Sequence, residues 1–386
     1  MNHSVVRASI FLGAIGFSLV SFAAERTPTD NMALNDPDQL SWRLFLAVSS
    51  RSGSSQALFS TWASDHDTFQ MDPVFPEETT PLAHHDPVLG PAIQTGDGPS
   101  APTEEVRRNR VAFDYIVENN LFTVSGLVAA FGRVLTFPAG AIEVKTNWLP
   151  IEDIPDFTLN RVTAEEVPTL FYVVPDGSGN LHALIAMHLI SKIVPSWTWA
   201  TFEHELNPGR CDIIGCADAF GAVEARVIPN AEPNQGYQDC RISDALSDLF
   251  ATADVDPLFQ NYCLKGSQTD FTDNTGLPVR LGNSITEAGF LDRSSCMTCH
   301  GLASFNEQGL PTTGAGFIAG QAQLGPIQPS WYWSFVPHYA NGEDLAPRSI
   351  SAMRIATSAD FVWSIPFCAV DDTDPDNIPP TRCASK

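Results

Sequence analysis

The spacing of apolar residues changes along the chain, and the change predicts where helices give way to strands. Residues 39–53 place apolar side chains at helical intervals and end at a glycine, which predicts a short helix. Residues 104–122 begin with acids and carry a crude apolar stripe, which predicts a second helix. Residues 72–102 hold seven prolines and no clear period, so we expect a long loop between these helices.

From residue 138 the period becomes two, which is the period of side chains along a strand. Two apolar runs flank the segment PDGSGN at 175–180, which predicts a hairpin. The segment WTWATFEH at 197–204 alternates again, so neighbouring side chains there should point to opposite faces. Residues 138–206 therefore predict an antiparallel sheet of about four strands.

The first 23 residues have the pattern of a secretion signal. Arg7 precedes an apolar run, and Ser21 and Ala23 are small residues suited to cleavage after Ala23. The apolar run is shorter than the roughly 20 residues of a membrane span. We therefore expect cleavage, no membrane-spanning segment in the mature chain, and a periplasmic or secreted location.

The charge balance limits the partners. The sequence has 45 acidic residues against 21 Lys and Arg, a net charge of −24. Such a surface repels nucleic acid and anionic lipid, and no basic run reverses this locally. The charge instead suits a basic or neutral protein partner.

Eight cysteines occur in the chain, and two of them belong to the segment CMTCH. An even remainder of six in an oxidising compartment predicts three disulfides, and none of the six has the paired spacing of a zinc knuckle. We favour the pairing with the shortest loops, because short loops cost least to close. That pairing is Cys211–Cys216, Cys240–Cys263 and Cys368–Cys383.

The segment CMTCH places Cys296, Cys299 and His300 at positions i, i+3 and i+4, which share one face of a helical turn. Two thiols on that face can each add to a porphyrin vinyl group, and the adjoining imidazole can bind the iron. A redox CxxC of the thioredoxin type needs a preceding βαβ unit, and a plain disulfide is the other alternative. The motif predicts one covalent haem c with His300 as the proximal iron ligand.

The segment SSCMTCHGLASF at 294–305 resembles the haem-attachment segment of c-type cytochromes, a resemblance that covers about residues 280–365. The segments MHLISKIVPSWTWATFEHELNP (187–208) and FVWSIPF (361–367) are similar to bacterial exported proteins described as cytochrome c family proteins. This second resemblance implies a shared architecture and supplies no reaction.

The resemblance and the periodicity together predict the fold class and its division. The expected class is α+β, an antiparallel β-sheet region followed by a mainly helical and loop-rich cytochrome c-like haem domain. The expected regions are a signal peptide (1–23), N-terminal helices with the Pro-rich loop (24–137), the β region (138–235) and the haem domain (236–386).

The sixth iron ligand separates an electron carrier from an enzyme. Met353 lies 53 residues after His300, a separation compatible with the distal methionine of small c-type cytochromes, although Arg follows it where many have Pro. His204 and then His188 are the next candidates.

Three functions remain open at this point. The first is electron transfer by the haem to a partner protein. The second is a haem-dependent oxidoreductase or peroxidase-like enzyme, with Glu203 and His204 as distal acid–base groups. The third is a binding or sensor protein in which the haem acts as a staple.

Overall fold

The chain is described by a computed structural model that covers residues 30–53, 56–77, 82, 102–313, 323–338, 349–373 and 383. The expected signal peptide at 1–23 and most of the second half of the Pro-rich loop lie outside the described residues.

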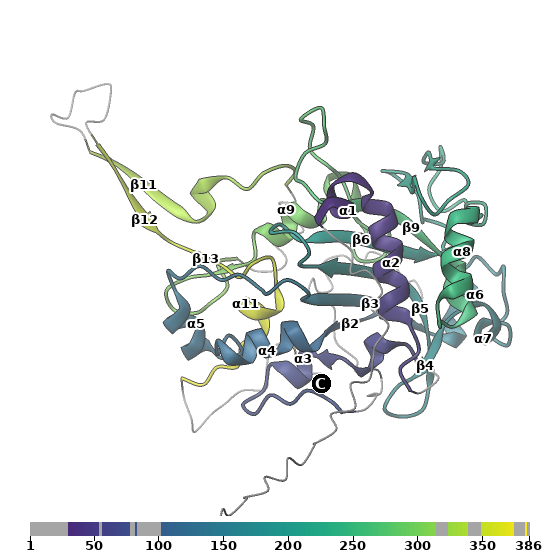
Figure 1. Cartoon of the computed structure of the whole chain (residues 1–386), viewed down its shortest axis with the longest axis horizontal. Coiled ribbons are helices and arrows are strands. Elements are labelled where there is room, and N and C mark those ends of the chain that lie inside the picture. The colour runs from purple at the N-terminus through teal and green to yellow at the C-terminus, as the bar shows by residue number, and fades with distance from the viewer. Residues whose placement is uncertain are drawn as a thin grey trace, which may run out of the picture.

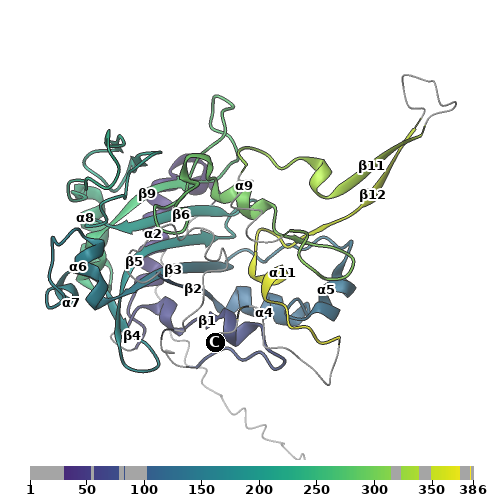
Figure 2. The same ribbon diagram turned by 180° about the vertical axis from the view of Figure 1, so that it is seen from behind.

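A seven-stranded sheet forms the centre of the molecule, and every paired neighbour in it is antiparallel (Figures 1 and 2). The strand at one end of this sheet comes from residues 236–386, the region predicted to be a mainly helical haem domain. The spatial order is β1 (Ala63–Ser64), β2 (Thr103–Arg108), β3 (Ile142–Pro150), β5 (Leu181–Ser191), β6 (Thr198–His204) and β9 (Tyr262–Gln268), while β4 (Val173–Pro175) pairs with the beginning of β5.

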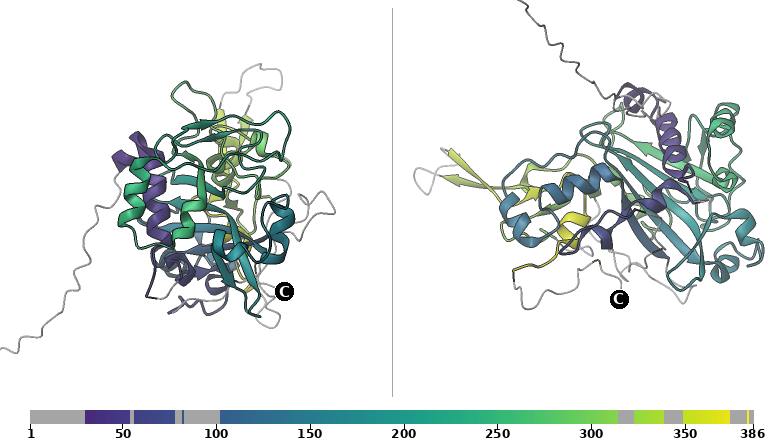
Figure 3. Two further views of the ribbon diagram at one scale, coloured as in Figure 1. Left: turned by 90° about the vertical axis from the view of Figure 1, so that its right-hand side faces the viewer. Right: turned by 60° about the horizontal axis from the view of Figure 1, so that its bottom comes forward.

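One face of the sheet is covered by α2 (Pro37–Ser49), and α8 (Asp244–Thr252) lies beside it (Figure 3, left). Helical spacing in α2 turns Trp42 and Phe45 toward the sheet. Both rings pack against Phe202 of β6, at centroid distances of 5.0 Å and 4.3 Å. Burial of these rings removes a large apolar area from water and fixes the helix to this face.

The helices α4 (Arg110–Glu118), α5 (Val124–Ala130), α9 (Cys296–Gly301) and α11 (Ser364–Cys368) gather toward one end of the strands in Figure 2. Their buried residues share a core with Ile190 and Trp199 on the opposite face of the sheet. Alternation along β5 sends Leu189 into the core beneath α2 and Ile190 into the core beneath α9. The sheet is therefore buried on both faces, and the candidate site lies on the face of Ile190.

The remaining elements are short. The helices are α1 (Asp30–Asn35), α3 (Asp65–Thr68), α6 (Ile154–Phe157) and α7 (Val167–Leu170), with 3₁₀ turns at Leu58–Thr61, Ile151–Asp153, Pro257–Asn261, Leu291–Arg293 and Pro329–Trp331. Three further strand pairs are β7 (Cys216–Ala217) with β8 (Arg226–Val227), β10 (Ser304–Phe305) with β13 (Thr357–Ser358), and β11 (Trp333–His338) with β12 (Ser349–Arg354). The β11–β12 ribbon projects away from the body (Figure 1).

The predicted fold class is wrong. The described part of residues 236–386 does not form a mainly helical cytochrome c-like domain, because it contributes β9 to the edge of the central sheet and β10 to β13 to smaller sheets. Within the described part of this region, the α-helices are only α8, α9 and α11. The strand β9 escaped prediction because polar residues such as Lys265 and Gln268 are buried in it, so its sequence shows no apolar run that would mark a buried strand.

The helix predicted over 104–122 is also partly wrong. Its first residues form β2, which pairs with β3, and the helix begins only at Arg110. The reason is local: Asn109 Oδ1 accepts a hydrogen bond from the backbone N–H of Ala112, 3.1 Å away, which is an N-cap.

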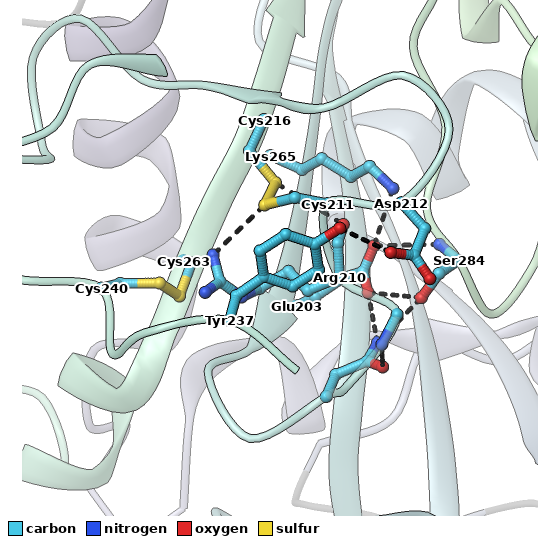
Figure 4. The surroundings of a disulfide bond; sticks show 12 residues. Glu203, Arg210, Cys211, Asp212, Cys216, Tyr237, Cys240, Cys263, Lys265 and Ser284 are labelled. Carbon is cyan, nitrogen blue, oxygen red and sulfur yellow. Dashed lines mark hydrogen bonds and ion pairs between the residues drawn. A yellow bond between two sulfur atoms is a disulfide. The ribbon is translucent and has the colours of Figure 1, made fainter. Parts of the chain in front are cut away.

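All three favoured disulfides are confirmed: Cys211–Cys216, Cys240–Cys263 and Cys368–Cys383. Figure 4 shows the first two side by side. Three disulfides in one chain are typical of extracellular or periplasmic proteins. No helix in the described ranges is long and apolar enough to span a membrane.

Asp65 lies near the third disulfide, and its carboxylate and the two sulfurs are within 4.8 Å of one another. Because Cys368 and Cys383 are bonded to each other, neither sulfur is available as a thiolate ligand. This cluster is therefore not a metal site.

Candidate functional site

The segment CMTCH forms a single helical turn, α9, as its spacing predicts. The end of β9 fixes the start of this helix: Gln268 accepts a hydrogen bond from the backbone N–H of Met297, 3.1 Å away, and donates one to Ser295 Oγ at 3.0 Å. Cys296, Cys299 and His300 then line one pocket between α9 and the sheet.

The two cysteines of α9 form no disulfide, whereas the other six cysteines form three. Burial raises the pKa of Cys299 to about 12 and that of Cys296 well above its usual range. A redox-active CxxC instead lowers the pKa of its nucleophilic thiol. The environment of α9 therefore disfavours a thioredoxin-type reaction and keeps both sulfurs as neutral thiols.

His300 is held in one orientation. Its Nδ1 donates a hydrogen bond to the backbone carbonyl of Phe361, 2.8 Å away, which leaves Nε2 as the nitrogen with a free lone pair. Burial lowers the pKa of His300 to about 3, so the imidazole is neutral at physiological pH. A neutral imidazole fixed at one nitrogen is the form in which histidine binds a metal.

The carbonyl that fixes His300 comes from an unusual piece of backbone. Asp360 and Phe361 have φ angles of +50° and +73°, a region that non-glycine residues rarely occupy. The Asp360 carboxylate accepts hydrogen bonds from Lys192 Nζ and from the backbone N–H of Phe137, each at 2.7 Å. These two contacts hold the strained backbone that presents the Phe361 carbonyl to His300.

The pocket is open to solvent at its mouth. Much of its wall is apolar and aromatic. The ring of Trp199 lies 4.7 Å from the His300 imidazole, and Trp363 donates a hydrogen bond from its Nε1 to the Cys299 carbonyl at 3.2 Å. The other apolar residues of the wall include Ile190, Phe290 and Phe367.

The sheet side of the pocket carries a row of ionisable side chains. Lys145 of β3 forms an ion pair with Glu104 of β2, with Nζ and Oε1 3.0 Å apart. His188 of β5 lies beside Glu287, with Nε2 and Oε2 3.4 Å apart. Lys145 and His188 are register partners on adjacent strands, so both side chains point into the pocket.

The ionisable groups of this row shift the pKa of Glu287 and of Lys145. Burial alone would raise the pKa of the Glu287 carboxyl, but His188 and Lys145 outweigh it and lower that pKa. Burial likewise opposes the charge of Lys145, but Glu104 and Glu287 raise its pKa above the usual value. Both groups are therefore charged at neutral pH.

The sequence prediction missed Lys145, Glu104 and Glu287 as parts of the site. One signal was available for Lys145, because the alternation of residues 142–146 already placed it on one face of a strand. Glu104 and Glu287 gave no such signal, since the segments that hold them were not predicted as strands or as pocket walls.

Glu203 and His204 do not line the pocket, so their prediction as distal acid–base groups is not supported by their position. Glu203 is fully buried and forms an ion pair with Lys265, with 3.3 Å between Oε1 and Nζ. It also accepts hydrogen bonds from the backbone N–H of Ser284 at 2.9 Å and from its Oγ at 2.7 Å (Figure 4). This is a structural ion pair.

His204 lies on the opposite face of β6 from Glu203, as the alternation predicts. Its ring stacks on Phe171 at a centroid distance of 3.5 Å. Its Nε2 donates a hydrogen bond to the Leu170 carbonyl at 3.1 Å, and its Nδ1 accepts a hydrogen bond from the backbone N–H of Leu206 at 3.2 Å. Because both nitrogens are engaged, His204 has no lone pair to offer an iron.

Met353 lies on β12 of the projecting ribbon, opposite Ser334 of β11. It is 61% exposed and does not line the pocket of His300. Of the three candidates for the sixth ligand, the structure brings only His188 into the pocket with Cys296, Cys299 and His300.

Comparison of the chain with family models, with curated proteins and with solved structures gives no match.

Proposed function

We propose that the chain binds one haem c covalently through Cys296 and Cys299, with His300 as the proximal iron ligand, and transfers electrons in the periplasm. The observation that carries the proposal is the α9 turn. It presents two unbonded thiols and a neutral imidazole with a free nitrogen to one pocket.

The residues around α9 fit a porphyrin. The aromatic and aliphatic residues of the pocket wall suit the apolar faces of a macrocycle, and the mouth of the pocket is open to solvent. When bound, the haem supplies a one-electron couple whose potential depends on its axial ligands and surroundings. The Phe361 carbonyl keeps His300 in the tautomer with a free Nε2, which is the form that binds iron.

The charge of the whole chain supports the transfer role. A net charge of −24 would attract a basic redox partner and raise the rate of encounter, and it would not repel a neutral one. The enzymatic alternative loses its proposed acid–base pair, because Glu203 and His204 lie outside the pocket with their polar atoms engaged. No contact in the described residues favours the sensor alternative. Secretion to the periplasm with cleavage after Ala23 completes the proposal.

Substitution of both thiols tests covalent attachment. We expect the mature protein, produced with a functional cytochrome c assembly pathway, to carry one haem that survives acidic acetone and adds to the polypeptide mass. In Cys296→Ser/Cys299→Ser the haem should be extractable or absent, because no sulfur remains to form a thioether. The matched control is Thr298→Ser, which lies within the same turn and leaves both sulfurs in place.

A wild-type protein that emerges colourless, at the mass of the bare polypeptide, would refute the proposal. Retention of acid-resistant haem in the double variant would refute the assignment of the two sulfurs.

A further inference from the structure

His188 occupies the wall of the pocket that faces α9. It belongs to β5, and its register partner on β3 is Lys145, which also lines the pocket. His188 and His300 line the same pocket. The two imidazoles therefore come from opposite walls, one from the sheet and one from the attachment helix.

The ring of His188 is held at one nitrogen. Its Nε2 lies 3.4 Å from the Glu287 carboxylate and 3.0 Å from Asn283 Nδ2. Nδ1 has a lone pair for a metal only in the tautomer whose Nε2–H donates to Glu287, because acceptance from the Asn283 amide would place the proton on Nδ1. Glu287 is itself fixed, because it accepts a hydrogen bond from the backbone N–H of Asn283 at 2.6 Å. No hydrogen bond from a described residue reaches Nδ1. Metal-binding histidines are usually oriented in this way, by a carboxylate or carbonyl at the nitrogen that does not bind the metal.

The competing side chains are less suited. Met353 is exposed on the projecting ribbon, and both nitrogens of His204 are engaged outside the pocket. Lys145 lies in the pocket, but its ammonium group is paired with Glu104 and carries its charge, so it has no lone pair for a metal.

We propose that His188 supplies the sixth iron ligand, so that the haem lies between two imidazoles, one from the sheet and one from α9. This inference rests on the proposed haem binding. It deepens that function, because two imidazoles leave no open position for peroxide or another small ligand and favour an electron carrier. Replacement of methionine by histidine at the axial position also lowers the reduction potential.

Optical and magnetic spectra of the haem-loaded protein test the assignment without any substitution. We expect a six-coordinate, low-spin ferric spectrum with the near-infrared charge-transfer band of two nitrogen ligands, and no weak near-red sulfur-to-iron band. The ferrous protein should not bind carbon monoxide. A sulfur-to-iron band in the wild-type protein would overturn the inference.

Substitution of His188 provides the second test. In His188→Ala the ferric haem should become high-spin, the ferrous haem should bind carbon monoxide, and the midpoint potential should rise. Met353→Ala is the matched control, because it removes another proposed ligand from an exposed position, and its spectrum and potential should equal those of the wild type. Glu287→Gln should keep the low-spin spectrum while the potential rises, since a neutral partner makes the imidazole a weaker donor.

The outcomes separate the two proposals. Acid-resistant haem together with an unchanged low-spin spectrum in His188→Ala would overturn the ligand assignment and leave haem binding intact. Loss of the low-spin spectrum in Lys145→Met alone would transfer the assignment to Lys145. Wild-type protein without haem would overturn both proposals.

Discussion

Lys265→Met should destabilise the folded protein by about 3–5 kcal/mol, because it leaves the Glu203 carboxylate buried without its cation. Both side chains of this pair are completely buried, with 3.3 Å between Nζ and Oε1. The hydrogen bonds from Ser284 satisfy part of the carboxylate but do not neutralise its charge. Urea denaturation of the mature protein with its disulfides intact measures the loss.

The control for this prediction is an ion pair of the same type on the surface. On α4, Arg110 Nε lies 2.9 Å from Asp114 Oδ1, and the two side chains are 64% and 42% exposed. Exposed pairs contribute about 0.2–1 kcal/mol, so Arg110→Met should cost no more than this. Equal losses in the two variants would show that the Glu203–Lys265 pair is accessible to water, contrary to the structure.

Acidification should destabilise the protein through His204, with an effect on the order of 4 kcal/mol between pH 6.5 and 3. Burial lowers the pKa of His204 from 6.5 in the unfolded chain to about 3 in the folded protein. The contribution of neutral His204 to the free energy of unfolding is fully present above pH 6.5. As the pH falls below this value, the unfolded chain binds a proton that the folded protein does not accept until about pH 3.

The comparison with His204→Gln isolates this contribution. Glutamine retains hydrogen-bonding groups but does not titrate, so its unfolding free energy should fall less steeply over the same pH range. Asp218, whose pKa burial raises to about 6, acts in the opposite direction, but it is present in both proteins and cancels in the difference. Parallel pH profiles for the two proteins would contradict the assignment of a neutral, buried His204.

The geometry of the α9 turn was determined by the sequence alone. Positions i, i+3 and i+4 share a helical face wherever the turn forms, so Cys296, Cys299 and His300 had to lie together. The disulfides were predictable for a similar reason, since the favoured pairs close short loops. The opposite orientation of Glu203 and His204 followed from the alternation of side chains along a strand.

The tertiary structure decided the fold class and the composition of the pocket. The alternation of side chains along a strand places Lys145 on one face of β3 and His188 on one face of β5. Only the strand order and register bring the two side chains together opposite α9. Glu287 is about a hundred residues from His188 in the sequence, and no local pattern joins them. The distance along the chain allowed Met353 as a ligand, yet the β11–β12 ribbon carries it away from the pocket. Local backbone geometry is fixed within a few residues, whereas strand pairing depends on burying both faces of the sheet at once, which is a property of the whole chain.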